Sequence, residues 1–249
     1  MNKQVVIVLA FFVAAMCGCA PSTNVKTEAT PAPVFNWDPA TTAAPNSAAV
    51  TFGIVGGEFG EDAGWGRYYP FSTFRTNMQG DFDELLTARG FITTGPFDTM
   101  EEMTYPDKKN CDLILVPDLD LTVPVQGLAF QEHTVLLGPK YWTINGTAIL
   151  GGRVTLSVVE SLSGTKMWNK SVAIDPVTVP YQGKTKFESP VGLSPNYGDE
   201  GMAAALAPHL EKAYMAILDK AWTYLDPEEM AVVKQQAMEV KENTRFQGS

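Results

Sequence analysis

The chain has 249 residues, of which 45% are hydrophobic and 18% are charged. This composition suits one globular domain with tails, and it excludes a wholly disordered or a collagen-like chain. With 18 Lys and Arg residues against 28 Asp and Glu residues, the formal net charge is −10. A surface this acidic repels phosphate backbones, so the composition argues against a nucleic-acid partner.

The first 19 residues, MNKQVVIVLAFFVAAMCGC, have the organisation of an export signal. Lys3 gives a positive start, and the apolar run Val5–Ala15 is too short to cross a membrane but long enough for a secretory signal. The run ends in Met-Cys-Gly-Cys, which resembles a bacterial lipobox. The resemblance implies a signal peptide over residues 1–18 and acylation of Cys19, with palmitate among its chains. The alternative is an ordinary cleaved signal that leaves Cys19 as a plain thiol.

Ala20, rather than an aspartate, follows this cysteine. In lipoproteins of this kind that residue implies sorting to the outer membrane. Two or more acyl chains hold a protein at a bilayer, so we expect the membrane to be a partner through the N-terminal lipid. The sequence leaves open whether the protein faces the periplasm or the cell surface. Residues 19–48 are rich in Pro, Thr, Ala and Ser and predict a flexible tether behind the anchor.

A folded domain is expected over residues 49–225. Its first part alternates strand and helix: a strand over VTFGIVGGEF, then a helix whose apolar residues run from Phe74 to Leu86 and which ends at Gly90. A short strand follows, and Asp98 with Glu101 resembles a capping pair for a short helix. Residues 111–123 form the clearest strand. Cys111 is in phase with Leu113, Leu115 and Leu119, which predicts a buried, inert thiol rather than a reactive one.

The second part of the domain predicts antiparallel strands over residues 125–175, with a hairpin turn at Ser161–Thr165. The Pro- and Gly-rich residues 176–200 are expected to be irregular. A long helix follows, with a broad apolar stripe from Leu206 to Leu225 that favours core packing over a dimer seam. Asp226 and Pro227 predict the start of a second helix, within a C-terminal segment over residues 226–249. The element order indicates an α+β fold: a mixed, largely antiparallel sheet with helices packed on one face.

Several segments together resemble the neuraminyllactose-binding haemagglutinin lipoprotein family, of the flagellar-sheath adhesin type. They are the lipobox, LLTARGF, CDLILVPDLDLTV, the hairpin LGGRVTLSVVESLSGTKMWNKSVAI, and the closing LDPEEMAVVKQQAMEVKENTRF. The resemblance covers roughly residues 50–245 and implies a TolB amino-terminal-like fold. In that family a short basic run after the central strand is the proposed sialic-acid site. The matching residues 121–131 contain no Lys or Arg here, so the family name transfers more safely than the sugar-binding activity.

The loop over residues 58–71 is the most suggestive binding feature. Trp65, Arg67, Tyr68 and Tyr69 stand among glycines, and flat aromatic rings with polar tips suit sugars or a protein partner. The alternative is that the loop folds back and buries its aromatic rings. We therefore treat these four residues as candidate ligand or partner contacts.

Signatures of catalysis are weak, and we expect no enzyme, no cofactor and no metal site. The histidines His133 and His209 belong to no known catalytic spacing, and His209 is expected to be a structural residue of the last long helix. Asp118 and Asp120 lie two apart on one strand face and are the best carboxylate pair. The simpler interpretation is that the strand there runs into solvent.

Two functions stay open. The first is an adhesin-like, non-catalytic binding module of the outer membrane that recognises a glycan or an envelope surface. The second is a structural or regulatory part of an envelope machine, such as a flagellar sheath, a secretion channel or peptidoglycan-synthase activation. Either role is compatible with a homo-oligomer.

Overall fold

The computed structural model describes residues 34–134, 140–185 and 195–247, all of which belong to one compact unit. The predicted signal peptide, Cys19 and residues 20–33 of the predicted tether lie outside the described residues. The acylation of Cys19 therefore stays a prediction.

Seven strands form one mixed sheet. β1 is central to its parallel part and pairs with both β3 and β4, whereas β4, β5 and β7 all run antiparallel to the long strand β6. β2 continues the line of β1 beside the second half of β4. The bounds are β1 Thr51–Val55, β2 Glu58–Phe59, β3 Ile92–Phe97, β4 Leu113–Thr122, β5 Val125–His133, β6 Tyr141–Glu160 and β7 Lys166–Thr185.

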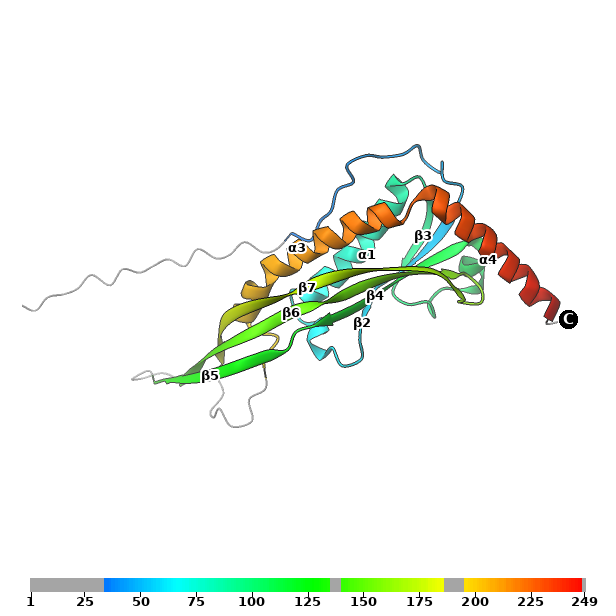
Figure 1. Cartoon of the computed structure of the whole chain (residues 1–249). Helices are drawn as coiled ribbons and strands as arrows, with labels where there is room; N and C mark the ends of the chain where they lie inside the picture. Colours follow the sequence, from blue (N-terminus) through cyan, green and yellow to red (C-terminus); the bar gives the residue numbers. More distant parts are fainter. Residues whose placement is uncertain (1–33, 135–139, 186–194, 248–249) are drawn as a thin grey trace, which may run out of the picture. The chain divides into compact units, whose positions relative to one another are not determined.

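Helices α1 (Phe71–Ala88) and α3 (Glu200–Tyr224) lie side by side along one face of this sheet (Figure 1). The described residues also form the short helices η1 (Gly64–Arg67) and α2 (Tyr105–Asn110) and the C-terminal helix α4 (Pro227–Gln247). This arrangement confirms the predicted α+β fold with its helices on one face. Gly90, with φ +86, ends α1 as predicted, and Asp226 accepts the first N–H groups of α4 from Glu228 and Glu229.

The apolar stripe of α3 forms the main core with the sheet. Leu210, Tyr214 and Ile217 are fully buried and belong to one cluster with inward-facing residues of β4 and β6. The inward residues alternate along each strand, as in Leu113, Leu115, Val154, Leu156 and Val158. Because these side chains are enclosed within one copy of the domain, the stripe is core, and the alternative of a dimer seam is wrong for it.

The turn between β6 and β7 forms where the sequence predicts it. Gly164, at φ +69, donates its N–H to the carbonyl oxygen of Glu160 at 3.0 Å. The Glu160 carboxylate is 1% exposed and accepts the backbone N–H groups of Leu162 and Ser163 at 3.0 and 2.6 Å. Burial alone would raise the pKa of Glu160, but these hydrogen bonds and the positive charge of Lys241 together hold it below its ordinary value.

The tether prediction is wrong for residues 34–48, which pack on the domain and are called the strap below. Phe35 and Trp37 are 2% and 4% exposed and belong to the main core. The Phe35 ring lies 5.8 Å from that of Phe74 on α1. The Trp37 indole N–H donates to Asp219 Oδ1 on α3 at 2.9 Å. The strap therefore bridges α1 and α3 and is part of the folded unit.

A buried carboxylate fixes the strap to both helices. Asp81 Oδ2 accepts the backbone N–H of Trp37 at 2.8 Å and the hydroxyl of Tyr214 at 2.6 Å. Burial raises the pKa of Asp81, and the hydrogen bonds from Tyr214 and Trp37 offset part of that rise. Burial and the neighbouring carboxylate raise the pKa of the Tyr214 hydroxyl, which therefore stays a hydrogen-bond donor.

Cys111 is buried as predicted, at 2% exposed, but it lies on the other face of the sheet from Leu113 and Leu115. It belongs to a second cluster with Val55, Met103, Ile114 and Val159. The predicted phase is wrong because Cys111 ends α2 and the strand begins only at Leu113. Burial raises the pKa of the Cys111 thiol, as expected for an inert cysteine.

Two further predictions differ from the structure. The short helix is capped by Thr104, whose hydroxyl and backbone N–H pair reciprocally with Asp107, and not by Asp98 with Glu101. Residues 176–185, expected to be irregular, continue β7. Pro176 and Pro180 are tolerated there because β7 pairs only with β6 and so lies at the edge of the sheet.

Candidate functional site

Trp65, one of the four candidate contact residues, is buried. It is 8% exposed, and its ring centroid lies 4.4 Å from that of Phe71 and 5.0 Å from that of Phe59. The loop therefore folds back over the core at this point, as the alternative interpretation proposed. Trp65 positions the loop but is not available for a surface contact.

The other three candidate residues form what we call the aromatic surface: Arg67 and Tyr69 are exposed, and Tyr68 is half-buried. The Arg67 guanidinium lies 4.9 Å from the centre of the Tyr68 ring and donates a hydrogen bond to the Tyr68 hydroxyl at 3.0 Å. Tyr69 is 42% exposed. Partial burial, and then the negative charge of Glu211 on α3, raise the pKa of its hydroxyl.

The chain supports this surface closely from behind. A methyl group at Gly198 would lie 3.1 Å from Cδ1 of Tyr68, so only a glycine lets the ring approach this backbone without a shift. The Arg67 guanidinium makes no ion pair with any described residue. It therefore keeps N–H groups for an external acceptor such as a carboxylate, while the tyrosine rings offer flat faces beside it.

The carboxylate pair Asp118 and Asp120 lies on the face of the sheet opposite α1 and α3. Both residues are exposed, and Asp120 pairs with Arg153 across the strands at 3.0 Å. Across the parallel neighbour, Asp118 is in register with Glu58. Within the described residues no group of three or more His, Cys, Asp or Glu side chains is placed to hold a metal ion. The strand thus runs into solvent here, which is the simpler of the two interpretations.

Residues 121–131, which match the basic segment of the haemagglutinin family, form the end of β4 and most of β5. Leu121, Val125 and Leu128 pack into or against the main core. The segment is therefore built into the sheet.

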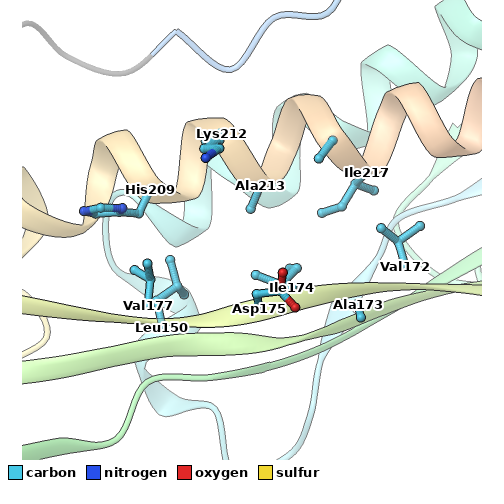
Figure 2. A pocket seen from close by; sticks show the side chains of 11 residues that line it. Leu150, Val172, Ala173, Ile174, Asp175, Val177, His209, Lys212, Ala213 and Ile217 are labelled. Atoms are coloured by element: carbon cyan, nitrogen blue, oxygen red, sulfur yellow. The ribbon is translucent and has the colours of Figure 1, made fainter.

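The structure also forms a pocket that the sequence did not predict, between α3 and the β6–β7 hairpin. Its volume is about 250 Å³ (Figure 2). His209 lines it and is exposed, so the prediction of a structural core histidine is wrong. Lys212 and Asp175 lie on the same pocket, from α3 and β7. Their separation in the sequence concealed this shared location, because only the packing of α3 on the hairpin brings both residues to one pocket.

In the described part of the chain, no helix is both long and apolar enough to span a bilayer. No protein-family model matches the sequence, and no curated protein matches it.

The fold is shared with a solved bacterial structure. A neuraminyllactose-binding hemagglutinin homolog from Helicobacter pylori aligns over 81% of this chain and 98% of its own length, with a TM-score of 0.54 and 12% identity. At that identity the likeness establishes the fold alone, which is the fold that the sequence resemblance implied.

Weaker matches include two further bacterial proteins. A DUF330 protein from Xanthomonas campestris covers 83% of this chain and 97% of its own, with a TM-score of 0.35 and 10% identity. A lipoprotein from Neisseria meningitidis aligns over 69% of this chain and 97% of its own length, with a TM-score of 0.29 and 10% identity. These TM-scores are too low to support a conclusion.

Proposed function

We propose that the protein is a non-catalytic lipoprotein of the outer membrane, held there by acylated Cys19, that acts as an adhesin-like binding module. The lipobox-like end of the export signal supports the anchor. The fold shared with the hemagglutinin homolog supports a binding role. The domain of residues 34–247 would then present its ligand surface at a distance from the bilayer set by residues 20–33, because the strap is part of the domain.

The single observation that carries the binding role is the aromatic surface. Arg67 stacks on Tyr68 with N–H groups left over, and the exposed Tyr69 lies beside it in sequence. A guanidinium beside flat rings suits an acidic sugar, whose carboxylate pairs with the arginine while its ring packs on a tyrosine. We propose that this surface replaces the basic run that residues 121–131 lack.

A glycan array tests this proposal. The wild-type protein should bind acidic glycans, and the triple variant Arg67→Ala, Tyr68→Ala, Tyr69→Ala should lose at least tenfold in apparent affinity. The matched control carries Arg75→Ala and Tyr105→Ala, which remove an exposed arginine and an exposed tyrosine elsewhere. If the wild type binds no glycan, or if the triple variant and the control bind equally, the proposed sugar site is wrong.

Surface display is tested separately by adding protease to whole cells. An adhesin must face the outside, so we expect cleavage of the domain in intact cells and protection of a periplasmic marker protein. Protection of the domain until the outer membrane is opened would exclude the adhesin role.

The second candidate is a structural or regulatory component of an envelope machine, and the open face of the sheet favours it. This face carries small polar side chains in register, such as Thr155 hydrogen-bonded to Ser171 at 2.8 Å, beside the exposed pair Asp120 and Arg153. An exposed polar surface of this kind suits a protein partner better than a small ligand. A photocrosslinker at Thr155 in living cells should then capture one stoichiometric protein. Capture of nothing, or of this chain alone, would exclude such a partner.

A further inference from the structure

The pocket between α3 and the β6–β7 hairpin, called the slot below, has a mostly apolar lining. Leu150, Val172, Ile174 and Val177 form the sheet side, and Ala213 and Ile217 form part of the helix side. Figure 2 shows these side chains between the middle part of α3 and the strands. Apolar side chains that line an open space favour an apolar occupant over water.

The length of the slot suits a short hydrocarbon chain. His209 and Ile217 mark its ends on α3, and at the helical rise their separation corresponds to a length of roughly 12 Å. The volume of about 250 Å³ lies just below the range of pockets that hold drug-sized ligands, so the slot suits a small, slender occupant.

The two ends of the slot differ on the helix side. Ile217 and Val172 lie toward one end, whereas His209 and Lys212 lie toward the other, above the apolar Val177 and Leu150 of the strand side (Figure 2). Asp175 lies on the strand side between them. Among the described residues, none of these three polar side chains has an ion-pair partner within 4.0 Å or a side-chain hydrogen bond. Two donors and one carboxylate are thus left for a ligand.

A bulge in β7 includes Asp175 of the strand side. Asp175 and Pro176 both lie opposite Gly151, since Ile174 pairs with Gly152 and Val177 with Leu150. Gly151 admits this arrangement because a methyl group there would lie 3.2 Å from Cα of Pro176. Bulges of this kind change the direction in which side chains point, and they are common beside binding sites.

We propose that this slot binds a single-chain amphiphile whose head carries both a phosphate and an ammonium group. The alkyl chain lies between α3 and β7. The phosphate accepts hydrogen bonds from Lys212 and His209, and the ammonium group pairs with Asp175. The three unpaired groups and the apolar lining are all used by this one ligand class. The site is separate from the aromatic surface, so it stands whether or not a glycan binds there.

Photolabelling of the full chain in lipid nanodiscs tests the proposal. The probe is a dodecylphosphocholine analogue with a diazirine and an alkyne on its chain, used below its micellar concentration. We expect labelled peptides from α3 and from β7. Unlabelled dodecylphosphocholine should compete best, dodecyl phosphate at least threefold less well, and dodecyltrimethylammonium least. Labelling confined to other segments, or equal competition by the cationic amphiphile, would overturn the proposal.

Matched variants separate the slot from unspecific contact with lipid. Ala216→Trp fills the slot from the exposed side of α3, and Lys212→Glu reverses the charge on its helix side; each should reduce labelling at least tenfold. The controls Ala204→Trp and Lys220→Glu make the same changes at exposed α3 positions that do not line the slot, and should stay within twofold of wild type. Circular dichroism checks that each variant is folded. If Ala216→Trp misfolds, Lys212→Glu against Lys220→Glu decides, and equal labelling of that pair contradicts the proposal.

Asp175→Asn tests the head group itself. Removal of the carboxylate should abolish the advantage of dodecylphosphocholine over dodecyl phosphate, because the ammonium group loses its partner while the phosphate keeps Lys212 and His209. If the order of competition is unchanged in Asp175→Asn, the ammonium contact is wrong.

Discussion

The strap supplies the sharpest test of how this domain is assembled, through the substitution Trp37→Ala. The indole is 4% exposed, packs 5.7 Å from the ring of Trp222 and donates to Asp219 at 2.9 Å. Truncation of a buried aromatic side chain of this size costs about 3–5 kcal/mol, because the cavity it leaves collapses only in part. The hydrogen bond to Asp219 adds little, since the freed carboxylate lies at the surface and is solvated.

For a domain of this size, each kcal/mol shifts the unfolding midpoint by about 2–4 °C. Trp37→Ala should therefore lower the midpoint by roughly 6–20 °C, measured by circular dichroism and checked by urea unfolding. Val34→Ala is the matched control from the same segment, because Val34 is 66% exposed, and it should change stability by less than about 0.5 kcal/mol. A loss below about 1 kcal/mol in Trp37→Ala would mean that the strap behaves as a tether, and the packing described above would be refuted.

Four further substitutions test other parts of the fold. Asp81→Asn keeps one oxygen that can accept both the Trp37 N–H and the Tyr214 O–H. In the wild type, burial raises the pKa of Asp81 in the folded state. Ionisation of this carboxyl group therefore lowers the stability of the fold as pH rises through that pKa. The stability of Asp81→Asn relative to wild type should therefore increase from pH 3.5 to pH 7, and a constant difference in urea unfolding would contradict this. The pKa of Glu160 is lowered in the folded state, so its contribution to stability is present at neutral pH and disappears as pH falls through the folded pKa. Glu160→Gln should therefore be less stable than the wild type at pH 7, and the two stabilities should converge in acid. Gly152 has φ +130, and a Cβ there would lie against the backbone oxygen of Asp120, so Gly152→Ala should lower the free energy of unfolding by about 2–4 kcal/mol. Gly80 lies in open space on α1, so Gly80→Ala should raise the free energy of unfolding by about 0.5–1 kcal/mol. Equal effects of the two substitutions in thermal unfolding would be inconsistent with the structure.

Periodicity predicted the elements whose pattern spans many residues. The stripe of α3 and the alternation along β6 repeat often enough to fix both the element and its buried face. The Ser161–Thr165 turn and the Gly90 helix end were predicted as well, because each depends on a local backbone conformation that one glycine supplies.

Predictions from shorter or compositional signals were less accurate. The strap has the composition of a linker, yet the two aromatic residues in Phe35-Asn36-Trp37 are buried against α1 and α3 and anchor it there. Pro176 suggested a loop because prolines break strands, but the edge position of β7 removes that penalty. Such outcomes depend on tertiary position, which a single sequence does not specify.

The candidate site was predictable only in part. The loop with Arg67, Tyr68 and Tyr69 was identified from its aromatic residues among glycines, but nothing in the sequence separates these exposed residues from the buried Trp65. The slot was missed because its polar groups come from two distant elements. An exposed lysine next to the apolar stripe of α3, together with an Asp-Pro pair inside β7, is the only local signal for it.

Mass spectrometry of the N-terminal peptide of the protein purified from its own membrane tests the proposed anchor most directly. We predict a first residue of Cys19 that carries a diacylglyceryl group and an amide-linked acyl chain, with residues 1–18 absent. A free thiol at Cys19, or residues 1–18 still attached, would contradict the proposed placement at the outer membrane and the binding role that depends on it.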